Sequence, residues 1–400
     1  MTAAISHFIQ PLDVLFLRGN RLFGAAGSYG EALVPPWPSL AAGSLRSALL
    51  AREGVDLGEF ARGHAPHPEL GTPADPGSFT VEAFQLAREH DGRIEPLYPL
   101  PADLSAQVPN DEDAQTRESS DPPPLELRRS LPAAPAAGLE NSHPLPYVPV
   151  LPETRRGKPV GGLWLTGRGL ADWLAGDLPQ PDALLRTAEI WAPDPRIGIA
   201  LNPATRSAED AHLFTAQAVA MREGTGFVSR VRGATLPESL ALRLGGDGRA
   251  ASARQRAVDW PEPDLEAIAR SGRARLLLTT PGLFAHGWLP TGTAAPADDS
   301  ASRGAAFSLH GVEGRIVAAA VPRTEVISGW DLASNRPKPA HPAVPAGAVY
   351  WLELAPGTTA EALQRLATEG LWPADCNDEE ATRRAEGFNR CLLATWPETA

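Results

Sequence analysis

Apolar positions recur at every second residue over residues 12–17, and this pattern predicts a β-strand near the start of the chain. The even-numbered positions are all apolar, whereas the odd-numbered ones include Asp13, so one face of the strand is the more apolar. A proline cluster then disfavours a helix up to Ser39, which is a good N-cap. From there to residue 52 the apolar spacing indicates a helix. The first fifty residues are therefore predicted to form a strand, a loop and a helix.

The loop between this strand and this helix has the composition of a phosphate-binding segment. Gly24, Gly27 and Gly30 permit positive φ angles and a close approach of the backbone to another molecule. Arg18 and Arg21 lie at the end of the strand. Backbone N–H groups and arginine side chains are the donors that hold phosphate oxygens. The sequence therefore predicts phosphate contacts here.

The same order of strand, glycine loop and arginine returns in the second half of the chain. Residues 240–244 form a predicted strand, followed directly by Gly245, Gly246 and Gly248 and then by Arg249. Two interpretations of these glycines stay open at this point. One is a tight turn between two strands, and the other is a phosphate loop whose flanking arginines neutralise the ligand.

Shorter patterns predict the remaining elements. Strands are expected at residues 79–86, 94–100, 196–201, 213–221, 226–232, 275–280, 316–321, 349–354 and 387–396, and helices at 169–174, 265–269 and 359–369. Residues 213–221 and 226–232 are predicted to form a hairpin. Arg230 and Arg232 are two residues apart in its second strand, so they point the same way.

Residues 99–152 carry twelve prolines, and the acidic cluster at 103–121 lies among them. We expect no core there, but a long surface insertion that is partly disordered.

Two successive units of strands and helices indicate an α+β protein built from two packed ferredoxin-like (βαββαβ) domains. The first is expected at residues 1–233, with a proline-rich insertion at about 99–158. The second is expected at residues 234–400.

Charge and composition restrict the function. The net charge of −12 argues against indiscriminate nucleic-acid binding, because phosphate contacts dominate that affinity. Residues 222–256 nevertheless hold seven arginines against three acidic residues. Two cysteines give no disulfide framework and no zinc-binding spacing. No apolar run reaches the length of a membrane span and Met1–Gln10 lacks the features of a signal peptide, so we expect a cytoplasmic protein without membrane contact.

No common catalytic or nucleotide-binding motif is present in the sequence. It contains no GxxxxGK[ST], GxSxG or HExxH segment, and the glycines near residue 27 lack dinucleotide-fingerprint spacing. We therefore expect neither a metal nor a cofactor. A ribonuclease that acts without a metal remains an alternative, with His7 or His64 as general base.

Several segments, taken in order, resemble the third subunit of the Cmr complex, the type III-B CRISPR effector. They are LDVLFLRGNRLFG, PPWPSLAAGSLRSALL, RIGIALNPATRSAEDAHLF, LRLGGDGRAA and SGWDLASNRPKPAHPAVPAGAVYWLEL, within about residues 7–396. This family belongs to the repeat-associated RAMP proteins. The resemblance implies two RNA-recognition-type domains and no catalytic activity. It also implies that the subunit holds the 5′ repeat-derived handle of crRNA and contacts both the large polymerase/cyclase-like subunit and the neighbouring backbone RAMP subunit.

Carried onto this sequence, the resemblance assigns RNA contacts to residues at a strand end, at a helix start and in a glycine loop. These residues are Arg18, Arg21, Ser39, Gly43, Arg46, Gly245, Gly246, Gly248 and Arg249. We add Arg230 and Arg232 from the arginine-rich segment. The C-terminal glycine-rich loop typical of RAMP proteins is reduced here to Gly387 and its neighbours. Besides the ribonuclease, a scaffold that binds only proteins is a third possibility.

Overall fold

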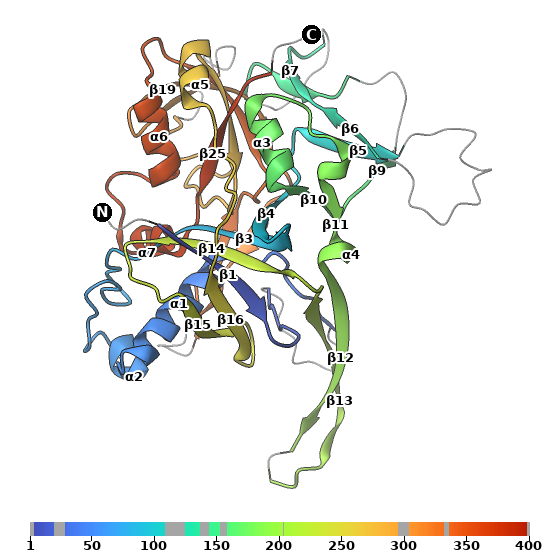
Figure 1. Cartoon of the computed structure of the whole chain (residues 1–400), viewed down its shortest axis with the longest axis vertical. Coiled ribbons are helices and arrows are strands. Elements are labelled where there is room, and N and C mark those ends of the chain that lie inside the picture. Colours follow the sequence, from blue (N-terminus) through green and yellow to red (C-terminus); the bar gives the residue numbers. More distant parts are fainter. Residues whose placement is uncertain are drawn as a thin grey trace, which may run out of the picture.

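The computed structural model of the chain describes residues 4–19, 29–108, 125–136, 144–152, 158–202, 204–294, 304–331 and 336–397. Its largest unit is an eight-stranded antiparallel sheet in the order β11-β10-β4-β3-β14-β1-β16-β15 (Figure 1). The strands are β1 (Ile5–Pro11), β3 (Thr80–His90), β4 (Arg93–Pro99), β10 (Leu163–Thr166), β11 (Leu184–Arg186), β14 (Thr225–Arg232), β15 (Ser239–Leu244) and β16 (Arg249–Gln255).

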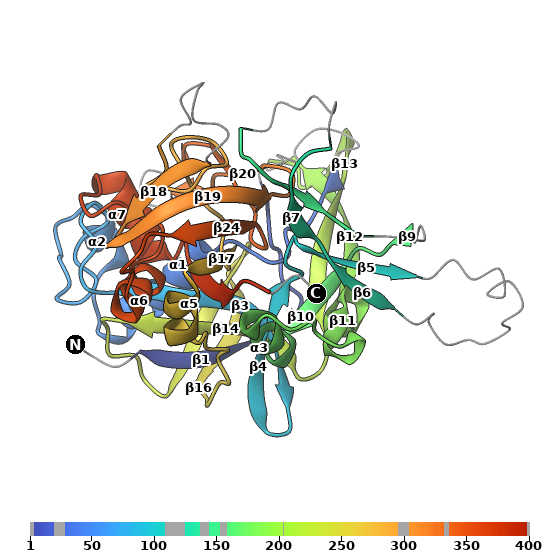
Figure 2. The same ribbon diagram turned by 90° about the horizontal axis from the view of Figure 1, so that it is seen from above.

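Helix α1 (Pro38–Arg52) packs on one face of this sheet, followed by the short α2 (Leu57–Ala61). Leu45 and Leu49 of α1 join apolar side chains of β1, β3, β14, β15 and β16 in one buried core. On the opposite face, no helix covers β1, β16 and β15 in either of two perpendicular views (Figures 1 and 2).

The second half of the chain builds a five-stranded sheet in the order β18-β19-β24-β17-β25. Its elements are β17 (Arg273–Leu278), β18 (Ala305–Leu309), β19 (Val312–Ala320), β24 (Val349–Leu354) and β25 (Cys391–Thr395), with helices α5 (Leu265–Ser271), α6 (Ala360–Glu369) and α7 (Asp378–Glu386). Leu363 and Leu366 of α6 point into its core, as the helical spacing predicts.

A third core joins the two sheets. Tyr98 of β4 and Trp173 of helix α3 (Gly167–Ala175) share it with Leu277 and Trp351 of the second sheet. At its centre the carboxylate of Asp103 and the guanidinium of Arg275 lie 2.8 Å apart, and both side chains are fully buried. The halves are therefore packed through a common interior that contains an ion pair.

The expectation that residues 99–152 form no core is wrong for the described part of that segment. Leu104, Leu127 and Leu145 are buried in the shared interior or in the second core. The prolines do not prevent short strands, and Pro132 and Pro149 lie within two of them. These strands are β5 (Leu104–Val108), β6 (Glu126–Arg129), β7 (Leu131–Ala133), β8 (Val148–Val150) and β9 (Lys158–Pro159), paired as β6-β5-β9 and β7-β8.

A long two-stranded arm projects from the body (Figure 1). Strand β12 (Trp191–Leu201) pairs antiparallel with β13 (Ala208–Met221), and β2 (Tyr29–Gly30) adds two residues beside β13. The predicted hairpin of residues 213–221 with 226–232 is wrong, because β14 pairs with β1 and β3 instead. Two strands adjacent in sequence thus lie in different sheets.

Small elements complete the described chain. They are α4 (Thr187–Ile190), a 3₁₀ turn (Pro181–Ala183), β20 (Glu325–Ile327), β21 (Trp330–Asp331), β22 (Arg336–Pro337) and β23 (His341–Ala343).

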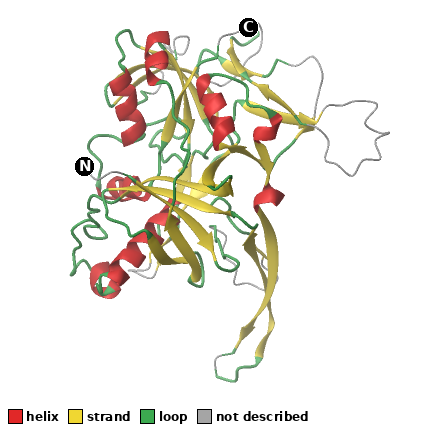
Figure 3. Cartoon of the chain, in the orientation of Figure 1, coloured by secondary structure: helices red, strands yellow, loops and turns green. Residues whose placement is uncertain are grey.

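Strands predominate over helices throughout, so the α+β prediction is confirmed (Figure 3). Two complete ferredoxin-like domains are not shown. Strands β3-β14-β1-β16 and β19-β24-β17-β25 both follow the 2-3-1-4 order of that motif. In the first set, however, strand β15 stands in place of the helix before the last strand. In the second, the described residues between β17 and β19 contain no helix. Because β15 and β16 pair with the N-terminal sheet, we propose that the domain boundary lies within residues 256–264 rather than at 233.

Candidate nucleic-acid interface

The glycine loop at residues 245–248 connects β15 to β16 and lies directly against the segment that follows β1. The backbone N–H of Gly246 donates to the carbonyl of Phe16 at 2.7 Å. Gly245 has a φ of 77°, and a Cβ there would lie 2.8 Å from the Phe16 carbonyl oxygen. The turn geometry thus requires glycine at this position. The two segments predicted separately from their similar sequences are in contact.

Arginines flank this contact, and each lies beside a carboxylate. The guanidinium of Arg249 is 3.0 Å from the Asp13 carboxylate and lies 5.0 Å over the Phe16 ring. Arg18 lies 3.8 Å from Asp247, and both of these side chains are more than half exposed. Exposed ion pairs of this kind contribute little to stability. The arginines are therefore positioned at the surface by partners that an anion can replace.

The strand predicted at residues 12–17, with its more apolar face on the even-numbered side, is wrong. Within this segment only isolated bridges form, from Leu15 to Val219 and from Phe16 to Gly246. Leu12 is 70% exposed, whereas Leu15 and Leu17 are buried. The chain leaves the sheet after Pro11, and Leu15 and Leu17 then face the core.

Arg230 and Arg232 share one face of β14, as predicted. Their Nε atoms lie 3.2 Å and 3.0 Å from the two carboxylate oxygens of Glu82 on β3. A β-bulge between Arg230 and Val231 places that single carboxylate between the two guanidinium groups. These arginines lie on the face of the sheet opposite α1.

Three further predicted residues lie on α1, away from the glycine loop. The helix begins at Pro38 with Trp37 as N-cap, so Ser39 is not the cap. Proline is tolerated there because the first helical N–H groups have no intrahelical acceptor. Arg46 lies 4.9 Å over the ring of Phe79, and burial lowers its pKa although the nearby Glu386 acts in the opposite direction. Arg46 is thus a packing residue in the described structure.

Gly43 is exposed in the middle of α1, and nothing lies within 4 Å of a Cβ added there. We expect Gly43→Ala to raise the free energy of unfolding by about 1 kcal/mol, because glycine is the poorer helix former. Urea denaturation measures this change. If the bare backbone serves a close approach of RNA, the same variant binds RNA more weakly. Unchanged RNA affinity would remove Gly43 from the interface.

The predicted site residues thus separate into three places. Arg18 and Arg249 gather with the three glycines, Arg230 and Arg232 lie on the sheet, and the helical residues lie on its other face. Arg21 lies outside the described residues. Sequence reasoning missed the carboxylates that hold the arginines, namely Asp13, Asp247 and Glu82. The one available signal for Asp13 was that it is the acidic residue of the predicted strand at residues 12–17.

The two histidines of the ribonuclease alternative differ in their access to a substrate. His7 is fully buried, its Nε2 lies 2.7 Å from the Pro237 carbonyl oxygen, and burial lowers its pKa. Its ring therefore has no access to a substrate. His64 is exposed beside Glu59, at 3.1 Å.

The helices and the metal-ligating side chains of the described residues bear on membrane and metal binding. None of the helices in this part of the chain is both long and apolar enough to span a membrane. Across the same residues, no three His, Cys, Asp or Glu side chains are grouped so that they would hold a metal ion.

Comparison with known proteins identifies the family. Residues 7–396 match the model of the CRISPR-associated protein family Cas_Cmr3. Because this match spans nearly the whole chain, the chain belongs to the Cas_Cmr3 family of CRISPR-associated proteins, as the sequence motifs predict. No curated protein matches the sequence.

Solved structures give further matches at low sequence identity. A chain in the cryo-EM structure of the type III-B Cmr-beta bound to cognate target RNA and AMPPnP has 15% identity and a TM-score of 0.48, with 97% of this chain and 96% of that chain covered. A chain in the structure bound to cognate target RNA alone has 14% identity and a TM-score of 0.47, with the same coverage.

Proposed function

We propose that this protein is a non-catalytic RNA-binding subunit of a type III-B CRISPR (Cmr) effector complex. The family match over residues 7–396 carries this proposal. In it, the chain holds the 5′ repeat-derived handle of crRNA and connects the large polymerase/cyclase-like subunit to the neighbouring backbone RAMP subunit.

The glycine-loop contact gives this proposal a location. Arg18 and Arg249 are held at the surface by Asp247 and Asp13, and the intervening backbone carries Gly245 and Gly246. A phosphate that approaches the loop replaces a weak exposed ion pair with a charge-assisted hydrogen bond. Each arginine then exchanges one anionic partner for another without losing its position.

The projecting arm supports a place in a larger assembly. Ile197, Leu201 and Leu213 on its strands are more than half exposed. An isolated two-stranded ribbon has marginal stability, and clustered exposed apolar side chains mark contact surfaces.

Arg18→Ala combined with Arg249→Ala tests the RNA contact. We expect the handle affinity to fall by at least about a hundredfold, since hydrogen bonds to charged groups contribute about 1.5–3 kcal/mol each and about 1.4 kcal/mol is a factor of ten. The slope of log K against log salt should fall by about 1.4, because each lost single-strand phosphate contact removes about 0.7. Fluorescence anisotropy of labelled handle RNA over a salt series measures both quantities. Arg46 is omitted from the pair because it packs on Phe79.

Arg52→Ala with Arg323→Ala is the matched control, since both side chains are exposed on other parts of the surface. An equal loss in this control would show that net charge alone sets the affinity.

Incubation of the chain with repeat RNA in EDTA distinguishes the ribonuclease. Discrete cleavage lost in His64→Ala would overturn the non-catalytic assignment.

A further inference from the structure

The open face of the large sheet is made of small and basic side chains. On β15 the outward positions are Ser239, Ala241 and Arg243, while the residues between them are buried leucines. On β16 the outward residues are Ala250, Ser252 and Arg254, and cross-strand pairing aligns them with those of β15. No helix covers these strands on this side (Figures 1 and 2).

The charge of this face has one sign. Its six outward positions on β15 and β16 include two arginines and no carboxylate. Arg254 lies opposite Ser239, whereas Arg243 lies four residues further along β15 and opposite Ala250. Four residues at about 3.3 Å each separate the arginines by about 13 Å along the strands. Short side chains form the floor between them, so an extended chain has room to lie on the sheet.

Two acidic groups of the same sheet are already engaged by other arginines. Glu82 lies between Arg230 and Arg232 on the neighbouring strands, and Glu89 lies 3.2 Å from Arg256. The charge of Arg243 and Arg254 is therefore not cancelled within the face. In a chain of net charge −12, this is a local excess of positive charge.

The side chains argue against a protein partner on this face. Protein interfaces have cores enriched in aromatic and other large apolar residues. Strands β15 and β16 carry no aromatic residue, and on the neighbouring β1 Phe8 is buried against the partly buried Trp260 and Val258. Without an aromatic side chain, the surface of these two strands also lacks a platform for base stacking. The complementary ligand is a flexible polyanion.

We propose that the face formed by β15 and β16 binds the sugar–phosphate backbone of single-stranded RNA, independently of base sequence. Arg243 and Arg254 contact phosphates about 13 Å apart, and Ser239 and Ser252 lie beside the path between them. The proposal rests on the proposed function in so far as that function brings RNA to this subunit. It adds a second contact surface, distinct from the glycine loop.

Two variants of the full chain test this surface. Arg243→Ala with Arg254→Ala removes both charges. Ala241→Glu places a carboxylate on the floor, where the exposed side chain leaves the core intact. The probes are labelled handle RNA and an oligouridylate of equal length, titrated by anisotropy over a salt series. Arg52→Ala with Arg323→Ala is again the charge-matched control, and unchanged melting temperatures show that each variant is folded.

We expect the double variant to lower the salt slope by about 1.4 with both RNAs, at about 0.7 per single-strand phosphate contact. Ala241→Glu should weaken both affinities at least fivefold, and the control pair should change neither. Unchanged salt slopes in both variants would overturn the proposal. This holds even if the variants lose binding to another subunit, because the face would then bind protein rather than RNA. If the wild-type chain binds the handle and Arg18→Ala with Arg249→Ala weakens it, the proposed function survives that result. If the wild-type chain binds neither RNA, both are overturned.

Discussion

Replacing Asp103 by alanine is expected to lower the free energy of unfolding by about 3–5 kcal/mol, because it leaves the buried cation of Arg275 without its counter-ion. Both side chains are fully buried at the junction of the two sheets. Desolvation lowers the pKa of Arg275 to about 10, so the guanidinium stays charged at neutral pH. Loss of the carboxylate therefore leaves a charged group in an apolar interior.

The other contacts of this ion pair are made by uncharged groups, which do not compensate for a lost carboxylate. Asp103 accepts from the indole N–H of Trp173 at 2.9 Å, and Arg275 donates to the Trp173 carbonyl at 2.6 Å and to the Thr395 carbonyl at 3.0 Å. The guanidinium carbon lies 3.9 Å over the Trp173 ring. One aspartate thus links helix α3 to strand β17 of the second sheet.

Urea denaturation followed by tryptophan fluorescence measures the effect. Asp182→Ala is the matched control, because Asp182 pairs with Arg168 at 2.9 Å while both side chains are more than 60% exposed. The control should stay within about 1 kcal/mol of the wild type. Equal destabilisation by both substitutions would contradict the special role of the buried pair.

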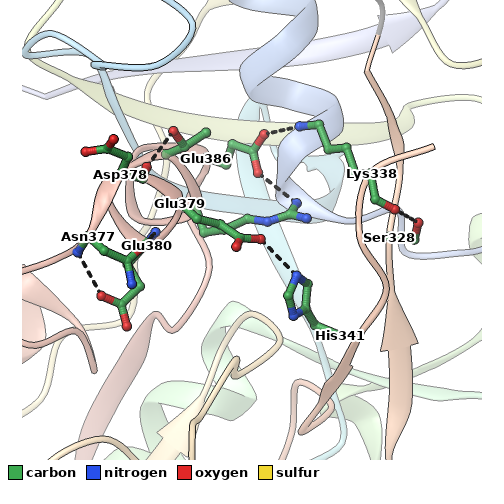
Figure 4. Close-up of polar contacts among 10 residues, drawn as sticks. Ser328, Lys338, His341, Asn377, Asp378, Glu379, Glu380 and Glu386 are labelled. Atoms are coloured by element: carbon green, nitrogen blue, oxygen red, sulfur yellow. Dashed lines mark hydrogen bonds and ion pairs between the residues drawn. The ribbon is translucent and has the colours of Figure 1, made fainter. Parts of the chain in front are cut away.

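Glu386→Ala is the second substitution with a large expected effect, again about 3–5 kcal/mol. Glu386 is buried near the end of α7 and accepts from Lys338 at 2.9 Å and from Arg383 at 3.1 Å (Figure 4). It also acts electrostatically on Arg46 of α1. Its removal leaves three cations close together where α7 meets α1.

Glu379, on the same helix, provides the control for this prediction. It lies 2.8 Å from His341 and is 55% exposed (Figure 4). Glu379→Ala should remain within about 1 kcal/mol of the wild type. Urea denaturation of both variants measures the difference. A Glu386→Ala protein as stable as Glu379→Ala would contradict the prediction and show that water or a moved cation fills the site.

The sequence predicted elements better than it predicted their partners. The apolar spacing of α1 located that helix to within two residues of its true start at Pro38. The error arose because proline acts as a helix breaker inside a helix but not in its first turn. Both uses of proline look the same in a single sequence.

Strand pairing was beyond the reach of local pattern. An alternation of period two fits residues 12–17, yet the paired strand is the preceding segment, β1. Its neighbours in the sheet are β14 and β16, whose Val231 and Ala253 are far away in the sequence. A shift of one residue reverses which side chains are buried, and only these distant partners set the register.

Part of the candidate interface was predictable and part was not. The glycine density at residues 245–248 fits the tight turn between β15 and β16, and the close approach to Phe16 accounts for it. The sequence did not show that Asp13 and Glu82 neutralise the arginines nearby, because these acids lie on other elements. Charge counted along a segment therefore overestimates the charge of the folded surface.

The two halves of the outer strand of the projecting arm differ in their protection against pairing with another chain, and this affects the chain before it is assembled. Strand β12 is the edge strand, and Pro193 and Pro195 in its first half lack the N–H groups that a foreign strand would pair with. Its second half, which contains Ile197 and Ile199, has no such protection. Until another protein covers that half, its unpaired N–H and C=O groups can pair with a strand of a second chain and start aggregation. The amount of this protein that remains usable should therefore follow the supply of its assembly partners.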